Sequence, residues 1–203
     1  MAITFEKQSF GGRFPEIWRG ECKMLPGGFK PTQEFAPGTV VRRATPVFVN
    51  FDEMSATVCK VASVLDGGTT TKVRVPKGHY FTKGDNVFKY GAEAPALVTV
   101  NEVDRTNSAY DFLTLSKAIT DIAKDDVLVE GKSVEGETQT VKAVCEPNMV
   151  VGADKQFDGK GLPTLDAAFE AVVLYPSLQF PILKEWLQGV ALKNNPNIIF
   201  IKQ

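Results

Sequence analysis

The dominant pattern along the chain is a series of short apolar runs between residues 37 and 131. Runs such as VVRRATPVFVNF, TTTKVRVP and DFLTLSKAI are rich in Val, Thr and Phe, and Gly, Pro, Asn or Asp separates them about every ten residues. Within TTTKVRV, Val73 and Val75 alternate with Lys72 and Arg74, as in a strand that exposes one face to solvent. The pattern predicts a mainly β unit over residues 37–131, folded as a β-barrel or sandwich.

Residues 1–36 have a different texture. Phenylalanines and Trp18 are scattered among Gly and Pro in FGGRFP and LPGGFKP, without a period of 2 or 3.6. This predicts an extended N-terminal arm that cannot bury its own aromatic side chains locally. Two interpretations remain open: the aromatics pack on the chain's own barrel, or they dock on a neighbouring subunit or a larger surface.

Residues 132–203 predict a small α+β C-terminal region, packed with the preceding domain. LPTLDAAFEAVVLYP indicates a helix with Thr164 as N-cap, an apolar stripe, and Pro176 at its end. Residues 179–188 indicate a second helix that stops at Gly189. The apolar run from Ile198 to Ile201 is too short for a helix and predicts a terminal strand buried on both faces.

Charge and composition remove several function classes. Lys and Arg number 23 against 24 Asp and Glu, with no basic cluster, so nucleic acid is not an expected partner. The chain has no 18-residue apolar run and no basic, then apolar, leader, so we expect neither membrane insertion nor export by a signal. Its three cysteines form no CxxC pair and are expected to be reduced, half-buried thiols of a protein made in a cytoplasm.

The only histidine, His79, lies in VRVPKGHYFTKGDNVFKYG. Pro76 ends one strand and Val87 begins the next, so His79, Tyr80 and Phe81 are predicted to lie on a loop, which makes them a candidate surface-recognition loop. Asp85 is the only acid close in sequence, and the stretch has no Ser or Cys nucleophile. A turn histidine is therefore favoured over a catalytic one.

No catalytic, cofactor or metal motif appears in the sequence. GxSxG, HExxH, GxxxxGK[ST] and GxGxxG after a strand are all missing, so no catalytic residue, cofactor or metal is predicted. A hydrolase with two carboxylates is the remaining enzyme class, and its candidates are Asp111, Asp125, Asp126 and Glu130. Solvated charges at turns and strand edges are the favoured interpretation of these four acids.

Four stretches together carry a family likeness: PGTVVRRATPVFVNFDEMSATVCKVASV, VRVPKGHYFTKGDNVF, NSAYDFLTLSKAITDIAKDDVLVEG, and LPTLDAAFEAVVLYPSLQFPILKEWLQGVALKNNPNIIFIKQ. They resemble the head fibre (capsid decoration) proteins of tailed bacteriophages, most closely those of phages and prophages of gut Bacteroidales. The resemblance implies a non-enzymatic virion protein on the outer capsid surface, bound to the major capsid protein, assembled as a homotrimer and aiding attachment to a host-surface glycan or protein. Within the arm, Phe10, Phe14, Ile17 and Trp18 are our candidates for binding the capsid or another subunit.

A carbohydrate-binding β-module of a gut bacterium or its prophage is the alternative. Such modules hold sugars on exposed aromatic side chains, and the candidates here are Tyr80, Phe81, Tyr90 and Tyr110, which lie on or beside predicted loops. The two functions are compatible, because a fibre on the capsid can itself bind a glycan.

Overall fold

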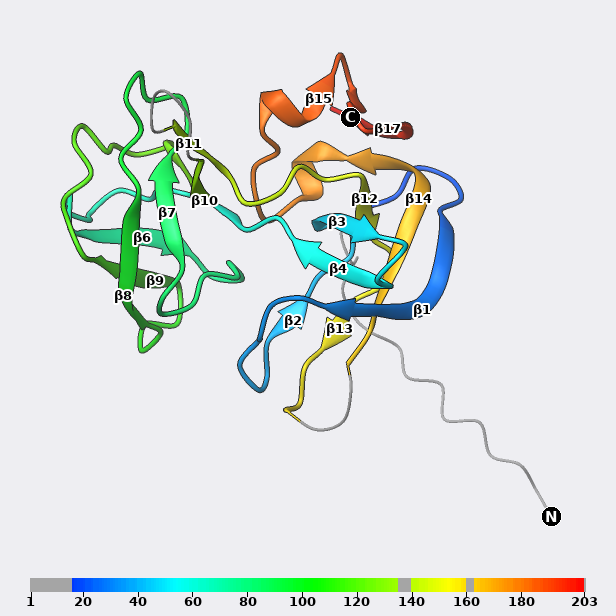
Figure 1. Cartoon of the computed structure of the whole chain (residues 1–203), viewed down its shortest axis with the longest axis horizontal. Helices are drawn as coiled ribbons and strands as arrows, with labels where there is room; N and C mark the ends of the chain where they lie inside the picture. Colours follow the sequence, from blue (N-terminus) through cyan, green and yellow to red (C-terminus); the bar gives the residue numbers. More distant parts are fainter. Residues whose placement is uncertain (1–15, 135–139, 160–162, 203) are drawn as a thin grey trace.

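The protein is mainly β. A computed structural model describes residues 16–134, 140–159 and 163–202, and Figure 1 shows its strands in two groups joined by two chain segments. The strands are β1 (Lys23–Pro31), β2 (Val40–Val41), β3 (Pro46–Asn50), β4 (Ser55–Val58), β5 (Val61–Ser63), β6 (Lys72–Pro76), β7 (Asn86–Lys89), β8 (Val98–Asp104), β9 (Tyr110–Leu115), β10 (Val127–Val134), β11 (Thr140–Ala143), β12 (Met149–Val151), β13 (Lys155–Gln156), β14 (Leu165–Leu174), β15 (Leu187–Gln188), β16 (Ala191–Leu192) and β17 (Asn195–Ile201).

The larger sheet combines both ends of the described chain. Its order is β1-β4-β3-β12-β14-β17-β16-β15, and an additional pairing of β1 with β14 closes its first five strands into a ring. The ring surrounds a core that includes Val47, Val58, Val150 and Leu165, each at most 1% exposed. A short ladder of β2 with β13 lies beside it.

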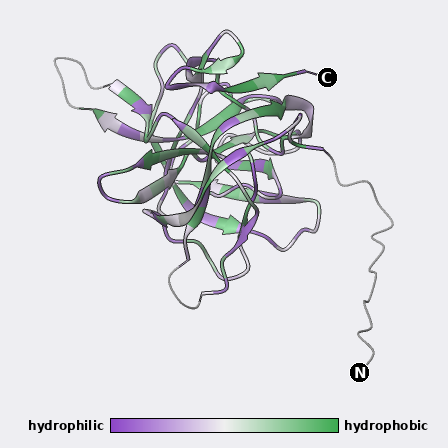
Figure 2. Ribbon diagram, turned by 90° about the vertical axis from the view of Figure 1, so that its right-hand side faces the viewer, coloured by the Kyte–Doolittle hydropathy of each residue, from purple (hydrophilic) through white to green (hydrophobic). Residues whose placement is uncertain are grey.

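The smaller sheet contains the middle of the chain in the order β11-β10-β7-β8-β9-β6, with β5 also paired to β10. Leu65, just after β5, donates its N–H to the Arg74 carbonyl in β6, so the sheet curls round on itself. The valines predicted to face inward, Val73 and Val75, are buried there around Phe81. In Figure 2 the apolar colour is concentrated on the strands, as this packing requires.

The two sheets do not follow the sequence blocks 1–36, 37–131 and 132–203. Residues 61–143 supply the strands of the smaller sheet, and the larger sheet takes strands from both sides of that stretch. Residues 23–31, included in the predicted arm, instead form β1, whose partners are β14 and β4. The extended arm is therefore a wrong prediction for this stretch: β14 supplies the hydrogen bonds, and Phe29 is only 3% exposed in the core.

The first predicted helix is also wrong, because Leu165 to Leu174 form the ten-residue strand β14. This strand pairs with β12 and β1 along its first half and with β17 along its second half. The alanines that favour a helix are needed here for their small size, since Ala168 is paired with both Met24 and Val150 and has no exposed surface. Tertiary pairing thus overrides helix propensity.

The second predicted helix is replaced by a single 3-10 turn, Lys184–Trp186, and a hairpin of β15 and β16. Ile182, Leu183 and Trp186 are all buried in the larger core, which irregular backbone permits. Gly189, predicted to stop a helix, has a φ of +66° in the hairpin turn. Another 3-10 turn, Tyr175–Ser177, follows β14.

The terminal strand is confirmed as β17, parallel to β14 and antiparallel to β16. Ile198 and Phe200 are buried in the core, whereas Ile199 and Ile201 on the other face are only half-buried. The predicted burial of this strand on both faces is therefore found in full on one face only.

Two segments, residues 59–60 and 144–148, connect the sheets, and we call them the neck. A buried charge cluster lies at this neck: Lys60 Nζ is 2.7 Å from Asp85 Oδ2 and 3.3 Å from Glu130 Oε1. The Lys60 side chain is 2% exposed, and both carboxylates are 13% exposed. Burial raises the pKa of Glu130, and the nearby Lys60 ammonium opposes that rise.

Gln33 ties the cluster to the larger sheet. Its side-chain amide donates to Glu130 Oε2 at 3.1 Å and to the Val58 carbonyl at 2.9 Å, while its oxygen accepts the Val58 N–H. Asp85 also accepts the Thr82 N–H. The cluster therefore contains few unsatisfied polar atoms and links β4, β7 and β10 at one point.

We expect Lys60→Met to lower the free energy of unfolding by about 3–5 kcal/mol, because two carboxylates would remain near the core without a cation. Lys23→Met is the control, since the Lys23–Glu170 pair is about half exposed and should contribute less than about 1 kcal/mol. Urea unfolding at neutral pH measures both. Equal losses in the two variants would contradict a special role for the neck cluster.

Candidate functional site

The predicted surface-recognition loop is buried. His79, Tyr80 and Phe81 are 8%, 4% and 0% exposed, so none of them presents its ring to solvent and that prediction is wrong. Phe81 fills the centre of the smaller sheet because the loop after β6 folds back over its core. Tyr80 points the other way: its hydroxyl accepts the Arg42 N–H at 2.9 Å and lies 3.1 Å from Thr45 Oγ1.

His79 is paired with an acid that is distant in sequence. Its Nδ1 accepts the Phe81 N–H at 3.1 Å, which places the proton of the neutral ring on Nε2. Nε2 lies 3.0 Å from Asp111 Oδ2, although its N–H is not well aligned with that oxygen. The other Asp111 oxygen binds Lys77 Nζ. Asp85, the acid close in sequence, instead binds Lys60.

Burial lowers the pKa of His79 to about 4, with Asp111 opposing the shift and Arg105 adding to it. The imidazole is therefore neutral at pH 7. In the described part of the chain, the polar partners of its ring are the Phe81 N–H and the Asp111 carboxylate, and neither is a hydroxyl or thiol nucleophile. The pair therefore has the features of a buried structural contact and not those of a nucleophile and its base.

The four candidate acids have different environments. Asp111 is buried and Glu130 is 13% exposed, and they bind the ammonium groups of Lys77 and Lys60, in contrast to the solvated charges expected. Asp126 lies 2.8 Å from Lys89 and also accepts the Ala123 N–H, while Asp125 is an exposed turn residue with a φ of +69°. Only Asp125 and Asp126 therefore match the expected roles at turns and strand edges.

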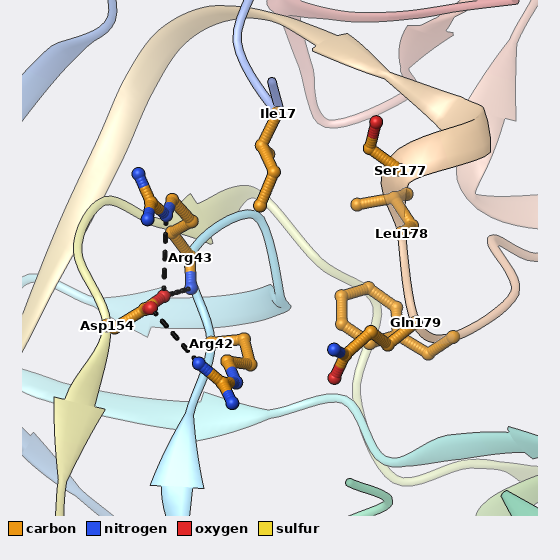
Figure 3. Close-up of a pocket in the computed structure, with 8 residues that line it drawn as sticks. Ile17, Arg42, Arg43, Asp154, Ser177, Leu178 and Gln179 are labelled. Atoms are coloured by element: carbon orange, nitrogen blue, oxygen red, sulfur yellow. Dashed lines mark hydrogen bonds and ion pairs between the residues drawn. The ribbon is translucent and has the colours of Figure 1, made fainter. Parts of the chain in front are cut away.

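Two adjoining cavities form a hollow with polar walls. The first has a volume of about 290 Å³ and lies between the arginine pair Arg42–Arg43 and the segment 177–180 (Figure 3). Asp154 accepts the Arg43 N–H at 2.7 Å and binds the Arg42 guanidinium at 3.3 Å. Ile17 and Leu178 add apolar walls, as Figure 3 shows.

The second cavity, about 490 Å³, shares Arg42 and Gln179 with the first. Its remaining walls come from both sheets: Pro37 to Val40 lie near β2, whereas Lys77, Gly78, His79, Tyr80, Arg105 and Asp111 belong to the smaller sheet and its loops. We call the two cavities together the Arg42 groove. It follows the junction between the sheets.

The groove carries an excess of positive charge. Arg42, Arg43, Arg105 and Lys77 contribute four cations against the carboxylates of Asp111 and Asp154. The Arg42 and Arg43 side chains are 48% and 41% exposed, so their remaining donors are open to solvent or a ligand. Guanidinium groups bind planar carboxylates and phosphates through two parallel hydrogen bonds, so the groove can hold an anionic group.

Sequence reasoning missed this groove. The available signal was the Arg42-Arg43 pair within the run VVRRATPVFVNF, which overall charge balance concealed. Arg105 and Lys77 carried no signal, because only the fold brings residues 77 and 105 beside residue 42.

The predicted docking residues fall into two groups. Phe10 and Phe14 lie outside the described residues. Ile17 and Trp18 are half-buried against the larger core, where the Ile17 carbonyl accepts the Leu174 N–H and Trp18 bridges to Val173. The structure therefore assigns these two residues the packing role on their own domain, and contact with a partner stays a prediction.

The remaining aromatic candidates are half-exposed. Tyr110 lies under the Arg74 guanidinium, 3.5 Å from ring centroid to Cζ, and meets Phe112 edge-on. Tyr90 borders a separate cavity of about 600 Å³ next to Trp186. Neither ring contacts the Arg42 groove.

Among residues 16–134, 140–159 and 163–202, no group of three or more His, Cys, Asp and Glu side chains could hold a metal ion. Within the same part of the chain, no helix has the length and apolar character needed to cross a membrane. Comparisons with protein-family models, curated proteins and solved structures find no match to this chain.

The lowered pKa of His79 makes stability depend on pH. Because the pKa falls from about 6.5 in the unfolded chain to about 4 in the fold, the stabilisation is present above pH 6.5 and is lost as the pH falls toward 4. The loss should be about 3 kcal/mol. His79→Gln should remove this component, since glutamine does not titrate. Urea unfolding from pH 7 to pH 4 measures it, and identical pH profiles for the two proteins would rule out the assignment.

Proposed function

We propose that the chain is a non-enzymatic head fibre, or decoration, protein of a phage capsid, and that its Arg42 groove binds an anionic group on the host surface. The observation that carries the binding part is the groove itself: four cations, partly exposed guanidinium groups and an apolar wall at the junction of two sheets. The virion part rests on the sequence resemblance, and the mainly β architecture is compatible with it.

The groove favours a particular ligand chemistry. A sugar carrying a carboxylate, sulfate or phosphate could bind through that group to the guanidinium donors of Arg42 and Arg43 that Asp154 leaves free. Ile17 and Leu178 offer an apolar surface to the C–H face of the ring. Acidic surface glycans of bacteria combine these two properties.

A binding role also agrees with the state of the acids in and near the groove. Asp154 is bonded to Arg42 and Arg43, and Asp111 is bonded to Lys77 and lies beside His79. Each carboxylate thus neutralises and orients a cation. A glycosidase instead needs one protonated carboxyl and a second free carboxylate facing the substrate.

Exposed apolar side chains on the larger sheet offer a candidate surface for the proposed self-association. Phe48, Phe51 and Met54 on and after β3 are 39–52% exposed, and Met24 on β1 is 45% exposed. Phe51 also meets Phe29 edge-on, which holds its ring in place. Large exposed apolar side chains clustered on one hairpin are typical of protein contact surfaces.

The alternative is a carbohydrate-binding module of a gut bacterium or its prophage, and the same groove favours it. The two functions differ in assembly: the fibre requires self-association and a capsid partner, whereas a module binds its glycan as a monomer. Assembly is therefore the property that separates them.

Light scattering coupled to size-exclusion chromatography should give three times the 22.2 kDa mass of one chain. Phe51→Ser with Met54→Ser should shift the protein toward the monomer, because it removes apolar area exposed on the β3–β4 hairpin. Thr114→Ser on β9 is the control. Two results together would contradict the head fibre proposal and favour the module. They are a wild-type protein that stays monomeric at micromolar concentration and a failure to sediment with capsids of its phage.

Glycan binding tests the groove separately. On a panel of neutral, uronate, sulfated and phosphorylated oligosaccharides, we expect binding only to the anionic members, with affinity that falls as salt rises. Arg42→Ala should weaken it by about tenfold or more, through loss of a charge-assisted hydrogen bond. Lys117→Ala, an exposed cation away from the groove, should leave binding unchanged. Equal binding of neutral sugars, or equal losses in the two variants, would count against the groove.

A further inference from the structure

Two of the three cysteines lie side by side although 86 positions separate them in the sequence. The Sγ atoms of Cys59 and Cys145 are 2.8 Å apart, and both residues are thiols in this structure. A disulfide bond measures about 2.05 Å, so only a small movement of the side chains separates this contact from a bond. The spacing along the chain gave no sign of the pairing.

Both thiols lie on the neck. Cys59 follows β4, where the chain leaves the larger sheet, and Cys145 follows β11, where the chain returns to it. The neck backbones are anchored on each side: the Cys59 N–H donates to the Pro46 carbonyl and the Val144 N–H donates to the backbone carbonyl of Glu130. The contact between the two sulfurs therefore lies between the outgoing and the returning segments of the neck.

The two thiols differ in access. Cys59 is 4% exposed, whereas Cys145 is half-buried and borders the open cavity of about 600 Å³ beside Tyr90 and Trp186. Lys132 and Lys142, opposite each other on β10 and β11, also line that cavity. A small anionic reagent can thus reach Cys145 before Cys59.

We propose that Cys59 and Cys145 are a covalent modification site, forming a disulfide across the neck by exchange with a small-molecule disulfide such as oxidised glutathione. The Cys145 thiolate attacks one sulfur of the reagent and forms a mixed disulfide, and one glutathione thiolate leaves. The Cys59 thiolate then attacks the Cys145 sulfur, and the second glutathione thiolate leaves. Two protein thiols are oxidised, one reagent disulfide is reduced to two thiols, and the protons pass to the released thiolates.

The second step should be the slower one. Burial, with a further contribution from Cys145, raises the pKa of the Cys59 thiol well above its usual range. The rate of bond formation should therefore increase with pH.

The bond would close a loop that contains the whole smaller sheet, β5 to β11. Closing a long loop restricts the unfolded chain and so stabilises the fold. It would also fix the distance between the two segments that hold the sheets together. This inference rests on the neck geometry alone and is independent of the proposed function.

Treatment with oxidised glutathione should reduce the number of titratable thiols in the denatured protein from three to one. Peptide mapping should show a peptide pair that joins Cys59 to Cys145, and dithiothreitol should reverse the change. The melting temperature should rise by about 5–15 °C on oxidation.

Cys145→Ser is the test variant, because this half-buried position tolerates a polar side chain better than the core position 59. It should fold, keep two thiols and show no rise in melting temperature on oxidation. Cys22→Ser is the matched control and should retain the full rise, since Cys22 lies before β1 and away from the pair. Three persisting thiols in the wild type, a bond to Cys22, or an undiminished rise in Cys145→Ser would overturn the proposal.

Discussion

The buried ammonium of Lys60 is the constraint on which the two-sheet arrangement depends. It binds Asp85 and Glu130, and through Gln33 it is connected to the edge of the larger sheet. A buried charge is tolerated only where partners surround it, so the strands that carry these partners cannot move independently. This cluster fixes how the smaller sheet meets the larger one. A few hydrogen bonds at the neck thereby help to set the geometry of the surfaces at the junction of the two sheets.

The Arg42 groove is one such surface. Arg42, Asp154 and Gln179 belong to the side of the larger sheet, and Lys77, Arg105 and Asp111 belong to the smaller one. Tyr80 holds these two sides together, because it leaves the smaller sheet and accepts the Arg42 N–H. The loop around His79 therefore forms part of the wall of the groove, although its rings are too buried for recognition at the surface.

The strands were predictable and their partners were not. Val73 and Val75 alternate with polar residues, and that period of 2 survives in any fold that buries one face. LDAAFEAVVL has the stripe of a helix, and the strand is imposed by its pairing with β1, β12 and β17, which come from distant parts of the chain. The same reason explains the site: His79 lies beside Asp111 and Cys59 beside Cys145, and no local pattern encodes either pair.

Because both sheets line the Arg42 groove, the proposed binding of a ligand there depends on the contacts that hold the two sheets together. A ligand that contacts Arg42 on one side and Arg105 on the other binds only the arrangement in which the two sheets are held together. Any free energy that the neck supplies to that arrangement lowers the conformational cost of binding. By the same linkage, the ligand stabilises the neck. The charge cluster, the thiol pair and the Tyr80–Arg42 contact thus all lie where the smaller sheet meets the larger.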